Sequence, residues 1–306
     1  MSEKRKKKVG SIAIPFLVTI FIATLLVGGA VYFIYHNFIG KKDDKIKEPP
    51  PRNGSISVSA EDSHTILLVL DDPEAPSDSN ATFVLMRSVP YKKNILFIGV
   101  PSNSIFYSQK ENTQIALKDK YTRGGAQAAE EFIEEALKID VDKYMVFDVN
   151  SFEKVCDLLG GVNYPVDIKL NGYPGDGTLE TLAADEITKY LTYNKFPGGE
   201  PERALKAATI LSYMINGSDG DRIATNFDRY FSEIINMIPN TNVTAVDYDK
   251  KKSAIQYMFN FGSGISIAAC VDGTDAEKDF IPSESFISNL PEEYFGEPTE
   301  PPTRPT

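Results

Sequence analysis

Two groups of charged residues have the types and the spacing to handle a phosphorylated ligand. Asp71 and Asp72 follow directly after an apolar run, and Asp78 lies shortly beyond them. Carboxylates are the usual protein ligands of Mg²⁺ and Mn²⁺. Arg203 and Lys206 are three residues apart, so on a helix they would share one face toward a phosphate. The pattern predicts a metal site at the aspartates and an anion site at Arg203 and Lys206.

Both groups also have a purely structural interpretation. The pair Asp71-Asp72 is more typical of a solvated strand end that leads into a turn, because no second carboxylate stands at Ala81, although Asp78 could substitute for it. Arg203 and Lys206 are equally typical of surface cations that pair with Glu200 or Glu202. These alternatives stay open at the level of the sequence.

The scarcity of histidine and cysteine excludes other kinds of site. His36 and His64 both precede the main alternating pattern, so a histidine-based triad is not expected. Two cysteines, Cys156 and Cys270, exclude a disulfide scaffold and a cysteine zinc site of the usual form. They could form one disulfide, but Cys156 falls on the apolar face of a predicted helix, which favours a buried free thiol.

Charge and hydropathy divide the chain into an anchor and an acidic domain. Residues 1–42 carry a net charge of +6, and the remainder carries −17 of the total of −11. So acidic a domain repels phosphate backbones, and we expect no nucleic-acid partner. The uncharged apolar run Ile12–Tyr35 is long enough to cross a bilayer. A cleaved signal peptide is the competing interpretation, but the run is long for one and no clean cleavage site follows it.

The predicted organisation is therefore a single-pass membrane protein with its main domain outside the cell, because the basic N-terminus should stay in the cytoplasm. The predicted segments are a cytoplasmic tail (1–10), a transmembrane anchor (11–36), a stalk linker (37–62), an extracytoplasmic domain (63–290) and a disordered Pro/Thr-rich tail (291–306).

The predicted strands and helices alternate along the domain, and this alternation indicates an α/β fold. We expect a three-layer sandwich in which a mixed central sheet is flanked by helices, preceded by one transmembrane helix. The predicted strands are Thr65–Leu70, Ala81–Ser88, Asn94–Val100, Tyr144–Val149, Val162–Leu170, Val243–Val246 and Ser263–Val271. The predicted helices run from Gly124-Gly125 through Leu137, from an Asn150 cap to Gly160-Gly161, and over Thr181–Tyr190, Glu202–Ile215, Asp228–Ile238 and Asp249–Phe259.

The order of these pieces resembles the LytR-CpsA-Psr family of cell-envelope proteins. The stretch from Arg123-Gly124-Gly125 to Gly160-Gly161-Val162 has the family's glycine pair, amphipathic helix, strand, helix and LGGV ending. Leu182–Leu211 is similar to its paired helices. Val243–Phe259 with Val271-Asp272-Gly273 and Ile281-Pro282 is similar to its C-terminal part.

The resemblance implies a protein that binds a polyprenyl pyrophosphate-linked glycan and transfers the phosphoglycan to peptidoglycan or another envelope acceptor. It implies an apolar tunnel for the lipid, several arginine donors for the pyrophosphate, and Mg²⁺ or Mn²⁺ in an active member. Asp71 matches the first family aspartate, and Arg203 matches one family arginine.

Most of the other charges that the resemblance calls for are replaced. The family's charged motifs fall on Ser79-Asn80-Ala81-Thr82, Pro101-Ser102-Asn103, Leu191-Thr192-Tyr193-Asn194 and Glu202–Ala208, in which Arg203 is kept and Lys206 is a substitute that cannot fork onto phosphate. We therefore expect a non-catalytic binder of lipid-linked or wall glycan, or a helper of an active paralogue.

The alternative is an active glycopolymer phosphotransferase whose donors have moved. In that case Asp71 and Arg203 would be catalytic, and Asp71 and Asp72 would hold the metal. Arg87, Arg123, Arg203 and Lys206 would bind the pyrophosphate, with Asp78 as a further candidate.

Overall fold

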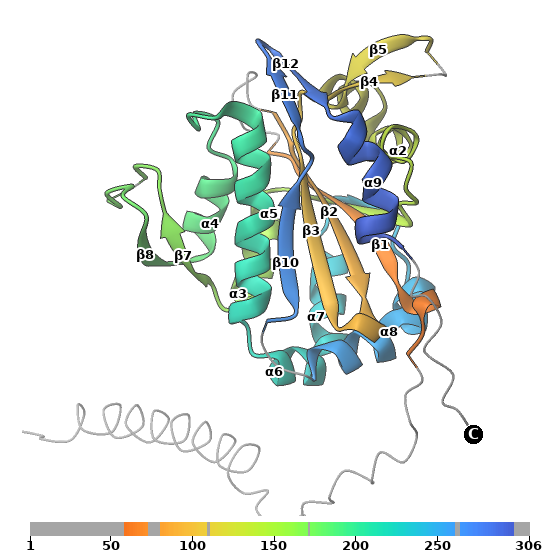
Figure 1. Ribbon diagram of the computed structural model, residues 1–306. Coiled ribbons are helices and arrows are strands. Elements are labelled where there is room, and N and C mark those ends of the chain that lie inside the picture. Colours follow the sequence, from red (N-terminus) through yellow and green to blue (C-terminus); the bar gives the residue numbers. More distant parts are fainter. Residues whose placement is uncertain (1–57, 73–79, 109–110, 171, 261–263, 297–306) are drawn as a thin grey trace, which may run out of the picture. The chain divides into compact units, whose positions relative to one another are not determined.

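The computed structural model describes residues 58–72, 80–108, 111–170, 172–260 and 264–296, all within the unit Ile56–Thr306. Its centre is a six-stranded sheet in the order β10-β3-β2-β1-β6-β9. Figure 1 shows β10, β3, β2 and β1 of this sheet side by side. The strands are β1 (His64–Leu70), β2 (Thr82–Val89), β3 (Asn94–Val100), β6 (Lys143–Phe147), β9 (Asn240–Thr241) and β10 (Ser266–Cys270). The pairs β1–β6 and β3–β10 are parallel and the other pairs are antiparallel, so the predicted mixed sheet is confirmed.

Helices cover both faces of this sheet. Leu67 and Val69 of β1 pack with helices α2 (Leu117–Leu137) and α9 (Glu284–Tyr294). Leu70 belongs to a second core, together with residues of α3 (Val149–Leu159), α4 (Ala184–Leu191), α5 (Gly199–Gly217), α6 (Gly220–Thr225), α7 (Phe227–Ile235) and α8 (Ala245–Phe259). Successive side chains of a strand point to opposite faces of the sheet. Alternate residues of each continuous apolar run therefore pack into different cores.

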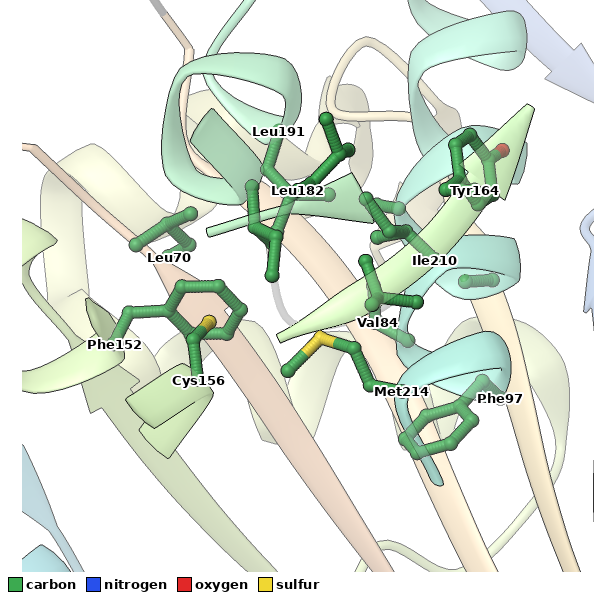
Figure 2. Packing of buried hydrophobic residues seen from close by; sticks show 14 of the residues in the cluster. Leu70, Val84, Phe97, Phe152, Cys156, Tyr164, Leu182, Leu191, Ile210 and Met214 are labelled. Carbon is green, nitrogen blue, oxygen red and sulfur yellow. The ribbon is translucent and has the colours of Figure 1, made fainter. Parts of the chain in front are cut away.

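The second core joins distant parts of the chain (Figure 2). Val84 and Phe97 come from the sheet, Cys156 comes from α3, and Ile210 and Met214 come from α5. Cys156 has no exposed surface and carries a free thiol, as does the half-buried Cys270, so the predicted free thiols are confirmed. Burial raises the pKa of the Cys156 thiol to about 12.

Three short hairpins stand outside the central sheet. They are β4–β5 (Ile105–Ser108 and Thr113–Ala116), β7–β8 (Val162–Val166 and Thr178–Leu182) and β11–β12 (Gly273–Ala276 and Asp279–Pro282). Two single-turn helices, η2 (Ala60–Asp62) and η3 (Pro90–Lys92), flank β1 and β2. The hairpin β4–β5 was not predicted, and β8 takes up the start of the predicted helix Thr181–Tyr190.

Two predicted helix starts are wrong for the same reason. Asp148, not Asn150, caps α3: its Oδ1 accepts from the Ser151 amide at 2.8 Å. Thr244 caps α8 with Asp247 three residues on, so the second half of the predicted strand Val243–Val246 is helix and the first half is not a strand. In both cases a capping box satisfies the free N–H groups of the first turn and outweighs the local β-propensity.

The glycine pair in α2 also has another role. The helix begins at Leu117, and Gly125 interrupts it with a φ of 68°. The pair therefore marks a kink, where only glycine adopts this backbone readily, and not the helix start.

The C-terminal boundary extends beyond the predicted one. Helix α9 continues to Tyr294 through Pro291, so the first residues assigned to the tail are helical. In the described part of the chain no helix is long and apolar enough to cross a membrane. The predicted anchor (11–36) lies outside the described residues.

Candidate functional site

Arg203 lies where α5 approaches the sheet at the carboxyl end of β1. The approach depends on Gly99 of β3, because a Cβ there would lie 2.1 Å from the carbonyl oxygen of Ala204. A side chain at position 99 would force α5 away from the sheet. Gly99 therefore brings the first turns of α5 against the start of β2.

The guanidinium of Arg203 is buried, with 5% of the side chain exposed. Its Nε and Nη2 donate to the two carboxylate oxygens of Glu200 at 3.0 and 2.7 Å. Its Nη1 donates to the Asn80 carbonyl at 3.1 Å and to Thr82 Oγ1 at 2.6 Å, and Nη2 also donates to the Ala81 carbonyl at 3.0 Å. All five N–H donors that an arginine has are thus used within the protein.

Glu200 completes this network, which we call the Arg203–Glu200 cluster and which consists of Asn80, Ala81, Thr82, Ser102, Glu200 and Arg203. The Ser102 hydroxyl donates to the Glu200 carboxylate. Burial raises the pKa of Glu200, but the charge and hydrogen bonds of Arg203, with those of Ser102 and Asn80, outweigh it and lower the pKa overall. The carboxylate is therefore held in its charged form.

Lys206 lies one turn after Arg203 and has a different partner. Its ammonium group pairs with the Asp167 carboxylate, which also accepts from the Tyr190 hydroxyl at 2.7 Å. Of the two alternatives for Arg203 and Lys206, the structure shows ion pairs for both, although Asp167 was not among the partners considered. Glu202 accepts from the Gly198 amide instead.

The predicted metal ligands lie at the same end of the sheet. Leu70 is opposite Thr82, so Asp71 follows directly beyond the cluster's Thr82. Its Oδ2 accepts from the Tyr121 hydroxyl at 2.7 Å. Burial, together with this bond to Asp71, raises the pKa of Tyr121. Among the described residues there is no group of three or more His, Cys, Asp or Glu side chains that could hold a metal, and Asp78 lies outside them.

The remaining predicted phosphate ligands do not join Arg203. Arg123 is exposed on α2, 3.4 Å from Glu111. Arg87 lies five residues after Thr82 on β2, roughly 16 Å along the strand. It donates to Thr65 Oγ1 at 3.1 Å, and its guanidinium lies 4.3 Å from the ring centre of Phe295. The four cations proposed for one pyrophosphate therefore contact different partners in four places.

An apolar cavity of about 400 Å³ lies between the sheet and the helices of the second core. Its lining runs from Leu70, Thr82 and Leu191 to His64, Lys143 and Lys250. Between these ends it is lined almost entirely by apolar side chains, among them Leu68, Met86, Met145, Phe152 and Met214. Thr82 belongs both to the lining and to the Arg203–Glu200 cluster, so the cluster borders one end of the cavity.

Comparisons with known proteins identify the family of this chain. The family model described as LytR_cpsA_psr matches residues 31–183, half of the chain. The chain belongs to the LytR-CpsA-Psr family. It is 24% identical over 252 residues to the polyisoprenyl-teichoic acid–peptidoglycan teichoic acid transferase TagU of Bacillus subtilis (strain 168), covering 80% of this chain and 82% of TagU.

Two crystal structures show the same fold. A protein from Eubacterium siraeum superposes with a TM-score of 0.66 at 17% identity, over 82% of this chain and 98% of that one. Bacillus subtilis TagV superposes with a TM-score of 0.59 at 17% identity, over 75% of this chain and 94% of TagV.

The structure brings together residues that the sequence analysis matched to three separate family motifs. Asn80, Ala81 and Thr82 from one motif meet Ser102 from a second and Arg203 from a third. Sequence reasoning missed Glu200 as the centre of this group. The available signal was its position three residues before Arg203 on one helix, which made it a candidate partner but could not show that both side chains are buried.

The charge state of Glu200 predicts how stability depends on pH. Because its folded-state pKa lies below the ordinary value of 4.5, the cluster stabilises the fold above that pH and loses this contribution as pH falls through the lowered pKa. We expect the urea midpoint to fall below about pH 4.5, and Glu200→Gln to flatten that fall. Asp185→Asn, at an exposed ion pair, is the control. An unchanged acid slope in Glu200→Gln would contradict this assignment.

Proposed function

We propose that this chain is a non-catalytic, lipid-binding member of the LytR-CpsA-Psr family that supports the attachment of lipid-linked glycopolymers to the cell wall. The observation that carries the proposal is that all five N–H donors of Arg203 bond to other groups of the protein, beside an apolar cavity. The relative TagU is named for the transfer of teichoic acid from a polyisoprenyl carrier to peptidoglycan, which supports the envelope setting.

The donors that a pyrophosphate needs are taken up by the protein itself. To bind phosphate, Arg203 would have to release the Glu200 carboxylate, which would then lie buried without its countercharge. The neighbouring motif positions Asn80, Ala81 and Ser102 carry no charge that could replace it. Transfer of a phosphoglycan depends on positioning and charge stabilisation of this kind, so its loss supports a binding role.

The apolar cavity supports the other half of the proposal, that this chain still binds a lipid. A concave, mostly apolar site with a few polar groups at its ends is the usual form of a small-molecule site, and an apolar chain would fill this one. We further propose that the segment 11–36 anchors the chain in the cell membrane with its main domain outside. There it would act on glycan carriers or peptidoglycan, alone or beside an active paralogue.

The direct test is a transfer assay with the full chain in nanodiscs. It uses a polyprenyl pyrophosphate-linked glycan, peptidoglycan fragments and either Mg²⁺ or Mn²⁺. We expect the lipid to bind and no phosphoglycan to appear on the acceptor, because the head-group donors are engaged. An active family transferase run in parallel confirms that donor and acceptor are competent. Metal-dependent transfer by this chain would overturn the proposal in favour of an enzyme in which Asp71 is a metal ligand and Arg123 a pyrophosphate donor.

A further inference from the structure

The two ends of the cavity differ in access. At the end beside the Arg203–Glu200 cluster, Leu70, Thr82 and Leu191 are exposed by only 7%, 5% and 3%. At the opposite end, which lies at the start of β1, the lining includes Asp142 and Lys250, both of which are exposed. All other described residues of the lining are buried or half-buried. The most exposed part of the described lining is therefore at the Lys250 end.

The ends also differ in charge. The lining at the Lys250 end holds three lysines, Lys143, Lys250 and Lys251, against the two carboxylates Asp142 and Asp247. At the opposite end the nearest cation, Arg203, is already neutralised by Glu200 at 2.7 Å. An anionic group that enters the cavity with an apolar chain is therefore attracted only to the Lys250 end.

Both carboxylates at the Lys250 end are engaged within the protein. Asp247 accepts from the Thr244 amide at 2.9 Å in the capping box of α8, and it lies 3.0 Å from the Lys143 ammonium. Asp142 accepts from the Thr65 amide at 2.7 Å.

Two lysines at this end form no ion pair with an acidic side chain among the described residues. Lys251 donates to the carbonyl oxygens of Glu61 and Ser63, which leave its charge uncompensated. Lys250 makes no hydrogen bond or ion pair with the residues that the structure describes. The Asp142 carboxylate keeps its charge, because its partner is a neutral amide. With Lys143 paired to Asp247, Lys250 and Lys251 outnumber Asp142, so the lining at this end carries a net positive charge.

Aromatic rings line the cavity close to the same end, where they offer an apolar surface to a ligand chain. Phe231 and Tyr248 stack with ring centres 4.0 Å apart, and both line the cavity. The Tyr248 hydroxyl bonds to Asp228, which fixes the ring at the edge of the opening. A chain that passes between these rings and the sheet would continue toward Met145 and Phe152.

We propose that the cavity takes a single apolar chain that ends in one anionic group, carboxylate or phosphate, and that this group lies at the Lys250 end with the chain pointing toward Thr82. This inference rests on the proposed function in one respect, namely that an apolar chain occupies the cavity. It adds the orientation: the head group lies at the end of β1 opposite to the family motif positions, roughly 20 Å away along the strand.

The test is photolabelling of the full chain in nanodiscs, with peptide mapping by mass spectrometry. Two palmitic acid probes carry a diazirine either next to the carboxylate or at the methyl end, and a pair of farnesyl phosphate probes is built in the same way. We expect the head-proximal diazirine to label residues 245–259 and the terminal diazirine to label residues near Leu191. The better-labelling pair identifies a carboxylate or a phosphate ligand. The reverse pattern overturns the proposed orientation.

A charge-reversed variant tests the role of the lysines. Lys250→Glu should weaken palmitate binding by about tenfold, and it should leave the binding of the neutral palmityl alcohol unchanged. Lys189→Glu, at an exposed position of α4 outside the cavity lining, is the matched control. Equal palmitate affinities of the two variants would overturn the charge argument. Labelling outside the cavity altogether would overturn its occupancy by lipid, whereas failure of the non-catalytic assignment would show only in the transfer assay.

Discussion

Arg203→Ala is expected to destabilise the domain by about 3–5 kcal/mol, the usual effect of removing one partner of a buried ion pair. The substitution leaves the Glu200 carboxylate, 17% exposed, without its countercharge. It also leaves the carbonyl groups of Asn80 and Ala81 and the Thr82 hydroxyl without a donor. Urea unfolding followed by circular dichroism measures the loss.

A matched pair of variants separates this effect from a general loss of charge. Lys189→Ala removes a cation from an exposed i,i+4 pair on α4 and should leave the unfolding midpoint unchanged. Glu200→Gln combined with Arg203→Met removes both charges of the buried pair and should be more stable than Arg203→Ala alone. If Arg203→Ala instead unfolds like the unsubstituted chain but loses affinity for polyprenyl pyrophosphate, Arg203 serves the ligand and not the fold.

Leu68→Trp is expected to weaken binding of an apolar chain by about tenfold or more while leaving stability within about 1 kcal/mol. Leu68 lies in the middle of β1, lines the cavity and is only half-buried. The larger side chain therefore enters empty space and displaces the ligand. The chain contains no other tryptophan, so the fluorescence of the new residue reports directly whether lipid still reaches it.

The neighbouring residue provides the control, because it points to the other face of the same strand. Leu67 has no exposed surface and packs against the α2 side of the sheet. Leu67→Trp should therefore destabilise the domain by about 1–3 kcal/mol through overpacking, without closing the cavity. Retention of lipid binding by Leu68→Trp would contradict the view that this cavity holds the chain.

The two substitutions address the two halves of the proposed function. Arg203→Ala tests whether the motif positions now serve the fold, and Leu68→Trp tests whether the space beneath the sheet still serves a ligand. Loss of stability in the first and loss of lipid binding in the second would describe a family member that keeps the lipid site and has closed the end where the family motifs meet.

Several predictions from the sequence are confirmed by particular elements. The runs Thr65–Leu70 and Asn94–Val100 form β1 and β3 nearly residue for residue, because a strand buried on both faces needs a continuous apolar run. Predictions at helix starts were less accurate. Side chains such as Asp148 and Thr244 cap backbone groups through contacts that local propensity does not weigh.

The sequence by itself determined the family and the mixed α/β fold. These properties depend on residue types in their order along the chain. Only the tertiary structure decided that the donors of Arg203 are taken by Glu200 and by groups more than a hundred residues away in sequence. It also decided that Arg87 and Arg123 contact other partners, and that an apolar cavity lies between the sheet and the helices. Which donors are free, and which apolar side chains line a space instead of filling it, depends on how distant segments pack, and that information is spread over the whole domain.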